Sequence, residues 1–246
     1  VGDPNSTPAE NVWDANFKLV SHMRDDPDTS HVRDSTSNDN DGTKKGAGEP
    51  VEVSGEIDSA QKFDGVDDYV SFPNDPAYKE LNGKNLSVFL WIKTTQVPDV
   101  WSAFISTYAK DTSGVTPNPN QFWSLTLFPP GKARIFYRRD NNAEEKNVYS
   151  TTAVNDGLWH QIGFIKRGLD LEIWVDSIKE NFDTLTTDGS TDNPNTLLTL
   201  ALFYYGFFNG TIDEVHISNS TRSAAWIKAS YESGRDDLND FGEEET

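Results

Sequence analysis

The sequence predicts an all-β protein, and three observations lead to that fold class. Short runs rich in β-branched and aromatic residues follow one another at the spacing of a β-sandwich, with turn-forming residues between them. Aromatic residues make up 12% of the chain and lie inside these runs, not at helical spacing. Helical patterns do not separate the runs, which argues against a parallel α/β sheet. We therefore expect antiparallel sheets, and a length of 246 residues is consistent with a single domain.

The two ends of the chain are polar. Residues 1–10 are polar and contain proline, and residues 236–246 consist mainly of Asp and Glu. Such segments bury little apolar surface, so we predict tails or linkers there and one domain over residues 11–235. Residues 25–50 nearly lack large apolar side chains, and the run 34–42 is rich in turn formers. We predict a long ordered loop in this region.

Strand-like runs follow from Asp68 onward. They are residues 69–72, 86–94, 103–108, 122–128, 133–138, 147–152, 160–166, 171–176, 198–205 and 211–217. In the second run, alternate residues from Leu86 to Ile92 are aliphatic, while Phe89 and Trp91 lie on the opposite side. Both faces of this strand should therefore be covered.

Two local signals complete the predicted elements. Residues 167–170 lie between two alternating runs, and Gly168 supplies any positive φ that a hairpin turn requires there. Residues 223–231 have the pattern of a helix, which we expect to begin at a Ser223 cap and to end near Gly234. In addition, the segments 60–70 and 210–217 suggest a sandwich that its own first and last strands close, with acidic residues where they meet.

Charge and composition exclude several classes of function. Asp and Glu outnumber Lys and Arg by 40 to 21, and a net charge of −19 would repel a nucleic acid. The same charge would attract Ca²⁺. There is no cysteine, hence no disulfide or thiol site, and no apolar run of about 18 residues that would insert into a membrane. The first residues lack the pattern of a signal peptide, so we expect a processed or excised piece.

Six blocks of the sequence resemble, in order, the laminin G-like, concanavalin A-like jelly-roll domains of extracellular bacterial and archaeal surface proteins. The blocks are FDGVDDYV at 63–70, LSVFLWIK at 86–93, DGLWHQI at 156–162, LEIWVD at 171–176, GTIDEV at 210–215 and WIKASY at 226–231. Residues 12–18 and the run 34–42 are also similar to the first strand and loop of these proteins. One departure is Ser177, where the family often has Gly, and it affects the turn that follows the fourth block.

The resemblance implies a two-sheet antiparallel jelly-roll sandwich with one short C-terminal helix. It also implies a secreted or cell-surface protein that binds carbohydrate or mediates cell adhesion, frequently with a structural calcium ion. In related sandwiches an Asp on the last strand meets an N-terminal loop, and this Asp corresponds to Asp213. We predict Asp213 as a calcium ligand, with Asp34 and Asp68 as its loop partners. The alternative is that Asp34 and Asp68 cap turns and that Asp213 is solvated.

Carbohydrate sites place flat aromatic rings against the apolar faces of sugars and use polar side chains for the hydroxyl groups. We predict Trp101, Tyr137 and Tyr205 as candidate rings, with Arg139 as a polar partner. Trp101 follows a loop and is the ring that we most expect to be exposed. Glycosylation sequons occur at Asn5, Asn85, Asn209 and Asn219.

Three functional hypotheses follow. We favour a non-catalytic extracellular binding module for a glycan or cell-surface polysaccharide. An alternative is a structural module of a surface layer, pilus or filament, whose partners are neighbouring protein subunits. A second alternative is a polysaccharide-cleaving enzyme, because some related sandwiches carry Glu-x-Asp-x-x-Glu on one strand. Residues 56–61 nearly match, but Gln61 stands in place of the acid/base Glu, and an amide cannot exchange the required proton.

Overall fold

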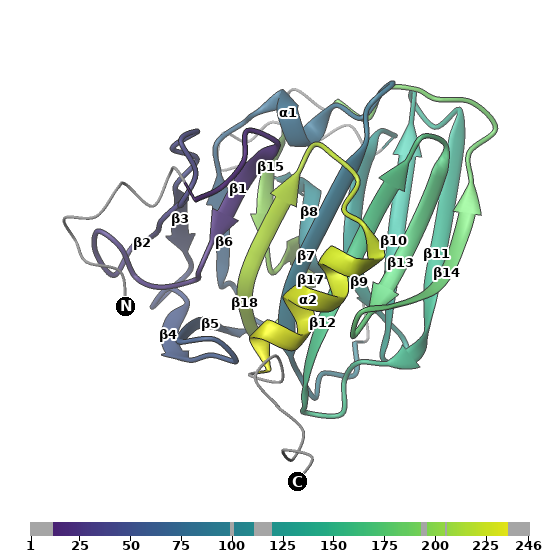
Figure 1. Ribbon diagram of the computed structural model, residues 1–246. Helices are drawn as coiled ribbons and strands as arrows, with labels where there is room; N and C mark the ends of the chain where they lie inside the picture. Colours follow the sequence, from purple (N-terminus) through teal and green to yellow (C-terminus); the bar gives the residue numbers. More distant parts are fainter. Residues whose placement is uncertain (1–11, 99–100, 111–119, 193–195, 205, 236–246) are drawn as a thin grey trace, which may run out of the picture.

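The computed structural model describes residues 12–98, 101–110, 120–192, 196–204 and 206–235. Within these residues two large β-sheets pack against each other, and helix α2 (Ala224–Gly234) lies across the outer face of the first sheet (Figure 1). All strand pairs in both sheets are antiparallel. The predicted all-β, two-sheet antiparallel sandwich with one short C-terminal helix is therefore confirmed.

The first sheet has eight strands, and β1 pairs with β18 beside the main order. In spatial order the strands are β14 (Ile178–Thr184), β13 (Asp170–Val175), β12 (Trp159–Arg167), β7 (Leu86–Lys93), β18 (Asn209–Ser218), β5 (Ser59–Asp64) and β4 (Val51–Ser54), with β1 (Phe17–Ser21) on β18. Neighbouring strands are often far apart in the sequence, as in the pair β7 and β18. The sheet therefore depends on long-range pairing.

The second sheet also has eight strands. In spatial order they are β11 (Glu144–Ala153), β10 (Lys132–Arg139), β9 (Phe122–Phe128), β8 (Ser102–Lys110), β15 (Thr196–Leu200), β6 (Tyr69–Phe72), β3 (Gly42–Lys45) and β2 (His31–Val32). A small hairpin of β16 (Leu202–Phe203) and β17 (Gly206–Phe207) forms a separate two-stranded unit.

The first and last strands lie side by side, as the sequence predicts. β1 pairs with the second half of β18, with Ser21 opposite Val215 and Phe17 opposite Ser218. The first half of β18 pairs instead with β5. One long strand thus joins both ends of the chain to the middle of the first sheet.

Strand β7 packs against the main core with one side and against helix α2 with the other. Its alternate aliphatic residues from Leu86 to Ile92 are buried in the main core between the sheets. On the other side of the strand, Phe89 lies 5.9 Å from the ring of Trp226, and Trp91 stacks on Tyr231 at 5.3 Å. Helix α2 supplies these partners, so both faces of β7 are covered, as predicted.

The predicted local signals are also present. The Ser223 hydroxyl accepts a hydrogen bond from the Trp226 backbone N–H at 3.2 Å and caps helix α2. Gly168 has a φ of 59° in the turn between β12 and β13. Asp176 and Ser177 have φ values of 49° and 66°, so a non-glycine residue occupies the left-handed position where related domains often have Gly.

The structure corrects the prediction of a long loop over residues 25–50. This region contains β2 and β3, which extend the second sheet beyond β6. The apolar alternation of a strand is missing because a charged side chain occupies an inner position. Lys44 is 2% exposed, and its ammonium group lies 2.7 Å from the Asp25 carboxylate. The sequence also missed helix α1 (Pro76–Lys79) and strand β14.

One predicted strand is divided in the structure. The run 198–205 breaks at Ala201, which has a φ of 65° and therefore cannot continue an extended strand. β15 ends before this residue, and the chain turns outward into the hairpin of β16 and β17. The hairpin consequently reaches the outer face of the second sheet, where the candidate site lies.

Candidate functional site

The outer face of the second sheet carries an aromatic cluster that is separate from the main core. Its buried members are Ala103, Tyr108, Phe122, Phe136 and Phe203, and Tyr204 packs against them. Phe122 and Phe136 point outward because their neighbours Trp123 and Tyr137 fill the main core on the inner side of the same strands. We call this cluster, together with Trp101, Arg134 and Arg138, the aromatic face.

Three rings of the aromatic face form a stack. Tyr204 lies parallel to Tyr108 at a centroid distance of 5.2 Å, and Tyr108 lies nearly parallel to Phe122 at 4.6 Å. Phe136 meets Phe122 edge-on at 4.9 Å. Tyr204 is only partly buried, so the outer end of the stack reaches the surface.

Trp101 is the exposed ring of this face. Its side chain is 43% exposed, and its ring meets Phe136 edge-on at 5.4 Å and lies 5.9 Å from Phe203. The ring is therefore supported from below while part of it stays accessible to a ligand. The sequence predicted that Trp101 would be exposed, and the structure confirms this.

A buried cation lies beneath Trp101. The guanidinium carbon of Arg134 is 4.7 Å from the Trp101 ring, 4.5 Å from Phe136 and 4.9 Å from Phe128. Burial lowers the pKa of Arg134 to about 10, so the group stays charged at neutral pH. Its Nε donates to the Thr126 hydroxyl at 3.1 Å, while Nη2 has no hydrogen-bond acceptor among the described residues. The Arg134 side chain is closed off from solvent, so it supports the Trp101 ring from below and does not itself face a ligand.

The polar edge of the face contains a second arginine. The Arg138 guanidinium lies 4.9 Å above the Phe136 ring and donates to Glu145 Oε2 from Nε at 2.7 Å. Both side chains are partly exposed, at 24% and 36%. This face therefore combines an exposed ring with charged and polar groups beside it, the combination that carbohydrate recognition requires.

Of the other predicted ligand-binding residues, Tyr137 and Arg139 do not contribute to this face. Tyr137 is fully buried in the main core, so its prediction as a ligand-binding ring is wrong. Arg139 lies on the same inner side of β10 and is 6% exposed. Its guanidinium donates to Glu144 at 2.9 Å, to Asp140 at 2.7 Å and to the Thr187 hydroxyl at 2.8 Å, which links the β10–β11 turn to the loop after β14. Tyr205 lies outside the described residues.

Tyr137 and Arg139 were predicted wrongly because they lie on the inner side of β10. Alternation along β10 places Arg134, Phe136 and Arg138 outside and Tyr137 and Arg139 inside. The sequence run alone does not say which set faces the other sheet. Only the alignment of β10 with β9 and β11 assigns the two sides.

The structure does not bring the three predicted calcium ligands together. Both carboxylate oxygens of Asp34 are occupied, because they accept from the backbone N–H groups of Val20, Thr36 and Asn40 and from the Thr36 hydroxyl. Asp34 is 1% exposed, and burial raises its pKa. This residue organises the turn after β2, which is the alternative that the sequence left open.

Asp213 is buried in β18 and is not solvated. It accepts hydrogen bonds from the Ile57 backbone N–H at 2.9 Å and from the Glu214 backbone N–H at 2.7 Å. Burial raises its pKa to about 7 despite these bonds. Asp213 thus holds the turn between β4 and β5 against the last strand.

Asp68 lies in a different carboxylate group. Among the described residues, Asp64, Asp67 and Asp68 form the group whose ligand atoms all lie within 4.8 Å of one another. The Asp68 Oδ2 atom accepts from the Asp64 backbone N–H at 3.0 Å, and burial raises the pKa of Asp68. The turn between β5 and β6 therefore concentrates three carboxylates, of which the sequence had selected one.

The sequons in the described part of the chain are accessible. Asn85, Asn209 and Asn219 are all exposed, although the Asn209 amide donates to the Asp64 carbonyl at 2.8 Å. Asn5 lies outside the described residues. The described residues contain no helix that is long and apolar enough to cross a membrane.

The near-match to a glycosidase motif has a structural role. Gln61 lies in β5 and is fully buried, and its amide donates to the Met23 carbonyl and to Asp25, each at 2.8 Å. His160 is also held in place, with its ring nitrogens 2.7 Å from Asp176 and 3.2 Å from Asp156. His160 thus makes structural hydrogen bonds at the start of β12.

Comparison with protein families agrees with this fold. Residues 64–228 match the family model of the concanavalin A-like lectin/glucanases superfamily. The chain belongs to this superfamily. The matched region contains the strands that form the aromatic face and ends inside helix α2. A search of curated proteins gave no match to the chain.

Solved structures share the superfamily fold at low sequence identity. Domain 4 of AbnA, an extracellular GH43 arabinanase from Geobacillus stearothermophilus solved with arabinotriose, has a TM-score of 0.68 and 20% identity. The similarity covers 88% of this chain and 98% of that domain. The binding domain of Paraclostridial Mosquitocidal Protein 1 has a TM-score of 0.67 and 9% identity. For the botulinum neurotoxin serotype G binding domain the values are 0.66 and 12%.

Coverage differs between these similar structures. The similarity covers 89% of this chain for the mosquitocidal protein and 88% for the neurotoxin. This chain spans only 52% and 50% of those two binding domains, so each contains a further part that has no counterpart here. The arabinanase domain corresponds to this chain over nearly its whole length.

Proposed function

We propose that this chain is a non-catalytic extracellular carbohydrate-binding module that holds its glycan against the aromatic face. The observation that carries the proposal is the half-exposed ring of Trp101, supported by Phe136 and placed over the buried cation of Arg134. An arabinanase domain of the same fold was solved with arabinotriose, which supports a sugar ligand.

The arrangement of the sandwich favours this face over the opposite one. Helix α2 covers the outer side of the first sheet (Figure 1). Phe89 and Trp91 of β7 pack against this helix. The outer side of the second sheet has no such helix among the described elements, and its short hairpin leaves part of Trp101 exposed. A sugar ring can stack on Trp101 while its hydroxyl groups bond the partly exposed side chains of Arg138 and Glu145.

The test is calorimetric titration of a panel of neutral oligosaccharides, including arabinotriose, against the wild-type chain and Trp101→Ala. We expect one or more binders, and at least a tenfold weaker affinity for the variant, which corresponds to about 1.4 kcal/mol of binding energy. Trp159→Ala is the matched control, because Trp159 is a partly buried tryptophan at the end of β12 in the other sheet. This control should bind like the wild type. If no glycan binds, or both variants lose affinity equally, the proposal is wrong.

The two other functions remain hypotheses with their own tests. A structural module of a surface layer, pilus or filament should associate with itself or with protein subunits. A monomeric mass by size-exclusion chromatography with light scattering, at physiological calcium, would argue against it. A polysaccharide-cleaving enzyme should release reducing ends from a broad polysaccharide panel. Such an enzyme needs two carboxyl groups about 5–5.5 Å apart if it retains configuration.

We propose in addition that a calcium ion stabilises the fold, with Asp68 as a ligand. The support is the carboxylate group of Asp64, Asp67 and Asp68, because oxygen-rich groups of this kind suit Ca²⁺. Asp34 does not fit this role, since each of its two oxygens already accepts two hydrogen bonds from protein donors. Asp213 stays a candidate ligand from the resemblance, although its two oxygens each accept a backbone N–H.

A further inference from the structure

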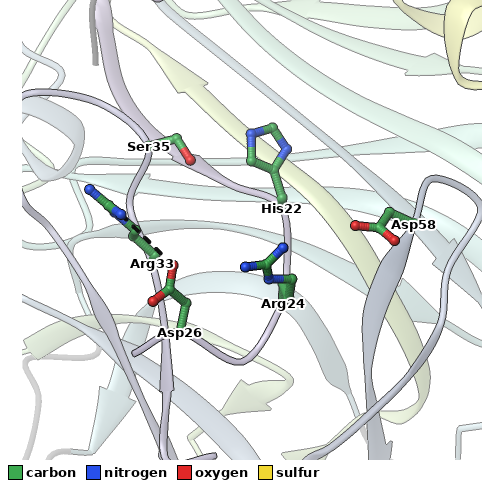
Figure 2. A pocket seen from close by; sticks show the side chains of 6 residues that line it. All are labelled: His22, Arg24, Asp26, Arg33, Ser35 and Asp58. Atoms are coloured by element: carbon green, nitrogen blue, oxygen red, sulfur yellow. Dashed lines mark ion pairs between the residues drawn. The ribbon is translucent and has the colours of Figure 1, made fainter. Parts of the chain in front are cut away.

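A cavity of about 260 Å³ opens where the start of the chain meets the turn between β4 and β5. None of its lining residues belongs to the aromatic face. The lining residues are all polar or charged, and they are His22, Arg24, Asp26, Arg33, Ser35 and Asp58. Figure 2 shows His22 and Arg24 on the segment after β1, Asp58 across from them, and the other three around β2.

The positive side of this cavity contains an uncommitted arginine. Arg33 is associated with Asp26, whose Oδ2 atom lies 3.8 Å from Arg33 Nη1. Arg24 lines the cavity and makes no hydrogen bond or ion pair with the residues that the structure describes. A guanidinium group presents a fork of N–H donors that matches a carboxylate. Arg24 is therefore placed to bind an anionic group that enters the cavity.

His22 adds a second donor when its ring is protonated, and its hydrogen bond with Glu214 both raises its pKa and fixes the orientation of the ring. Its Nδ1 atom lies 2.7 Å from Oε1 of Glu214, a buried carboxylate on β18. The other oxygen of Glu214 lies 3.0 Å from Nε2 of His216, so this carboxylate joins two rings. With Nδ1 on Glu214, the Nε2 atom of His22 is the ring nitrogen that is left for a ligand, and the side chain is 46% exposed.

The negative side of the cavity limits which anions fit. Asp58 and Asp26 would repel a multiply charged group such as phosphate, because like charges at close range in a partly buried site are unfavourable. The same carboxylates accept hydrogen bonds from hydroxyl groups, and Ser35 offers a further hydroxyl. The cavity therefore suits a molecule with one carboxylate and several hydroxyl groups. Its volume equals that of about nine liquid waters, which is room for one small sugar unit.

We propose that this cavity is a second binding site, for a uronic-acid-type sugar whose carboxylate binds Arg24 and His22 and whose hydroxyl groups bind Asp58 and Asp26. Nothing in the proposal depends on the aromatic face. An acidic sugar can occupy this cavity whether or not a neutral glycan binds at Trp101. The long-range field of a chain with charge −19 opposes any anion, so binding here requires these local donors.

The test uses NMR titration of the ¹⁵N-labelled chain with sodium glucuronate, glucose, acetate and inorganic phosphate in separate arms. We expect glucuronate to shift the amide resonances of residues 22–35 and 57–59 in a saturable manner. Glucose and acetate should require at least tenfold higher concentrations for the same shifts, because glucose lacks the carboxylate and acetate lacks the hydroxyl groups. Arg24→Gln should weaken glucuronate binding at least tenfold.

Two controls keep the test decisive. Lys62→Gln removes the same charge from an exposed position on β5 and should leave glucuronate binding unchanged. Trp101→Ala should also leave it unchanged, which separates this site from the aromatic face. Arg24 is exposed, so its variant should melt like the wild type. The proposal is overturned if glucuronate causes no saturable shift at these residues, if acetate or phosphate binds as tightly, or if Arg24→Gln has no effect.

Discussion

Individual buried charged side chains in this sandwich form hydrogen bonds with several segments of the chain at once and hold these segments together. Lys166 is fully buried, and its ammonium group donates to the carbonyls of Lys84 and Gly168 and to Asp188, at 2.8 to 3.0 Å. Arg139 and Asp34 play the same part with other loops. In a single sequence such residues look like ordinary surface charges, because Lys, Arg and Asp are rarely buried unless they are paired.

Replacing Lys166 tests this interpretation. Lys166→Met keeps the length of the side chain but leaves two carbonyls and the Asp188 carboxylate without their donor. We expect the free energy of unfolding to fall by about 3 kcal/mol in urea titrations. Lys228→Met, at a side chain that is 67% exposed on helix α2, should change it by less than about 0.5 kcal/mol. Equal effects of the two substitutions would contradict the assigned role of Lys166.

His160 should make stability depend on pH. Its hydrogen bond with Asp176 raises its pKa above the ordinary value of 6.5, although burial opposes this shift. Because the folded pKa is the higher one, the stabilising contribution is complete below about pH 6.5 and is lost as the pH rises through the folded pKa. The effect of His160→Gln on the free energy of unfolding should thus be about 1.5 kcal/mol larger at pH 5.5 than at pH 8.5. If the effect of His160→Gln is independent of pH, or larger at pH 8.5, the assigned role of the His160–Asp176 hydrogen bond is wrong.

Among the secondary-structure elements, helix α2 has the clearest task. It covers the outer face of the first sheet, where Ile227 packs in a buried cluster with Phe89, Ile165 and Trp174. The helix has only eleven residues, so its stability depends on this packing more than on its intrinsic propensity. Strand β7 in turn needs the helix, because its outward aromatic residues would otherwise be exposed.

A pair of neighbouring substitutions measures the contribution of this contact. Ile227→Ala should lower the free energy of unfolding by about 3 kcal/mol, since it removes buried apolar surface and leaves a cavity. Lys228→Ala is the matched control one position along the helix and should have almost no effect. Thermal melts of both variants give the comparison. A small effect of Ile227→Ala would mean that the helix is not essential to this face.

Two other elements close the side of the sandwich. β14 lies at the edge of the first sheet and β11 at the edge of the second. The Glu180 carboxylate on β14 accepts from the backbone N–H groups of Thr151 and Thr152 on β11, at 2.7 and 3.1 Å. This contact satisfies edge donors that would otherwise be open to pairing with another chain.

The molecule as a whole carries a charge of −19, so its carboxylates repel one another. Because bound cations reduce this repulsion, we expect the stability of the fold to depend on them. The proposed calcium ion would act on the turn between β5 and β6, which lies next to Asn209 at the start of β18. A ligand that binds only the folded state, at a hundred times its Kd, stabilises by about 2.7 kcal/mol. For a chain of this size such a gain corresponds to a rise in Tm of about 5 °C.

The calcium prediction needs a control for general charge screening. We expect 2 mM CaCl₂ to raise the Tm of the chelator-treated wild type by about 5 °C. Sodium chloride at the same ionic strength should raise it much less. Asp68→Asn should remove the calcium-dependent part, whereas Asp28→Asn, at an exposed carboxylate near β2, should retain it. If calcium and sodium chloride act alike, no specific ion stabilises the fold.

Local sequence patterns were sufficient for the class of fold and for much of its detail. Alternation in β7, the Gly168 turn, the Ser223 cap and the exposure of Trp101 were all predicted correctly, because each depends on neighbouring residues. The meeting of residues 60–70 with the last strand was predicted too, and β5 pairs with the first half of β18. The resemblance of six blocks to a known family supplied the two-sheet antiparallel architecture.

Tertiary structure alone decided which side chains meet. It placed Phe136 and Arg134 on the outer face and Tyr137 and Arg139 inside, and it put Asp34 and Asp68 in two different turns and Asp213 in strand β18. It also brought His22 to Glu214, 192 positions away in the chain. The physical reason is register: a strand shows its alternating sides in the sequence, but only pairing with distant strands determines which side is buried.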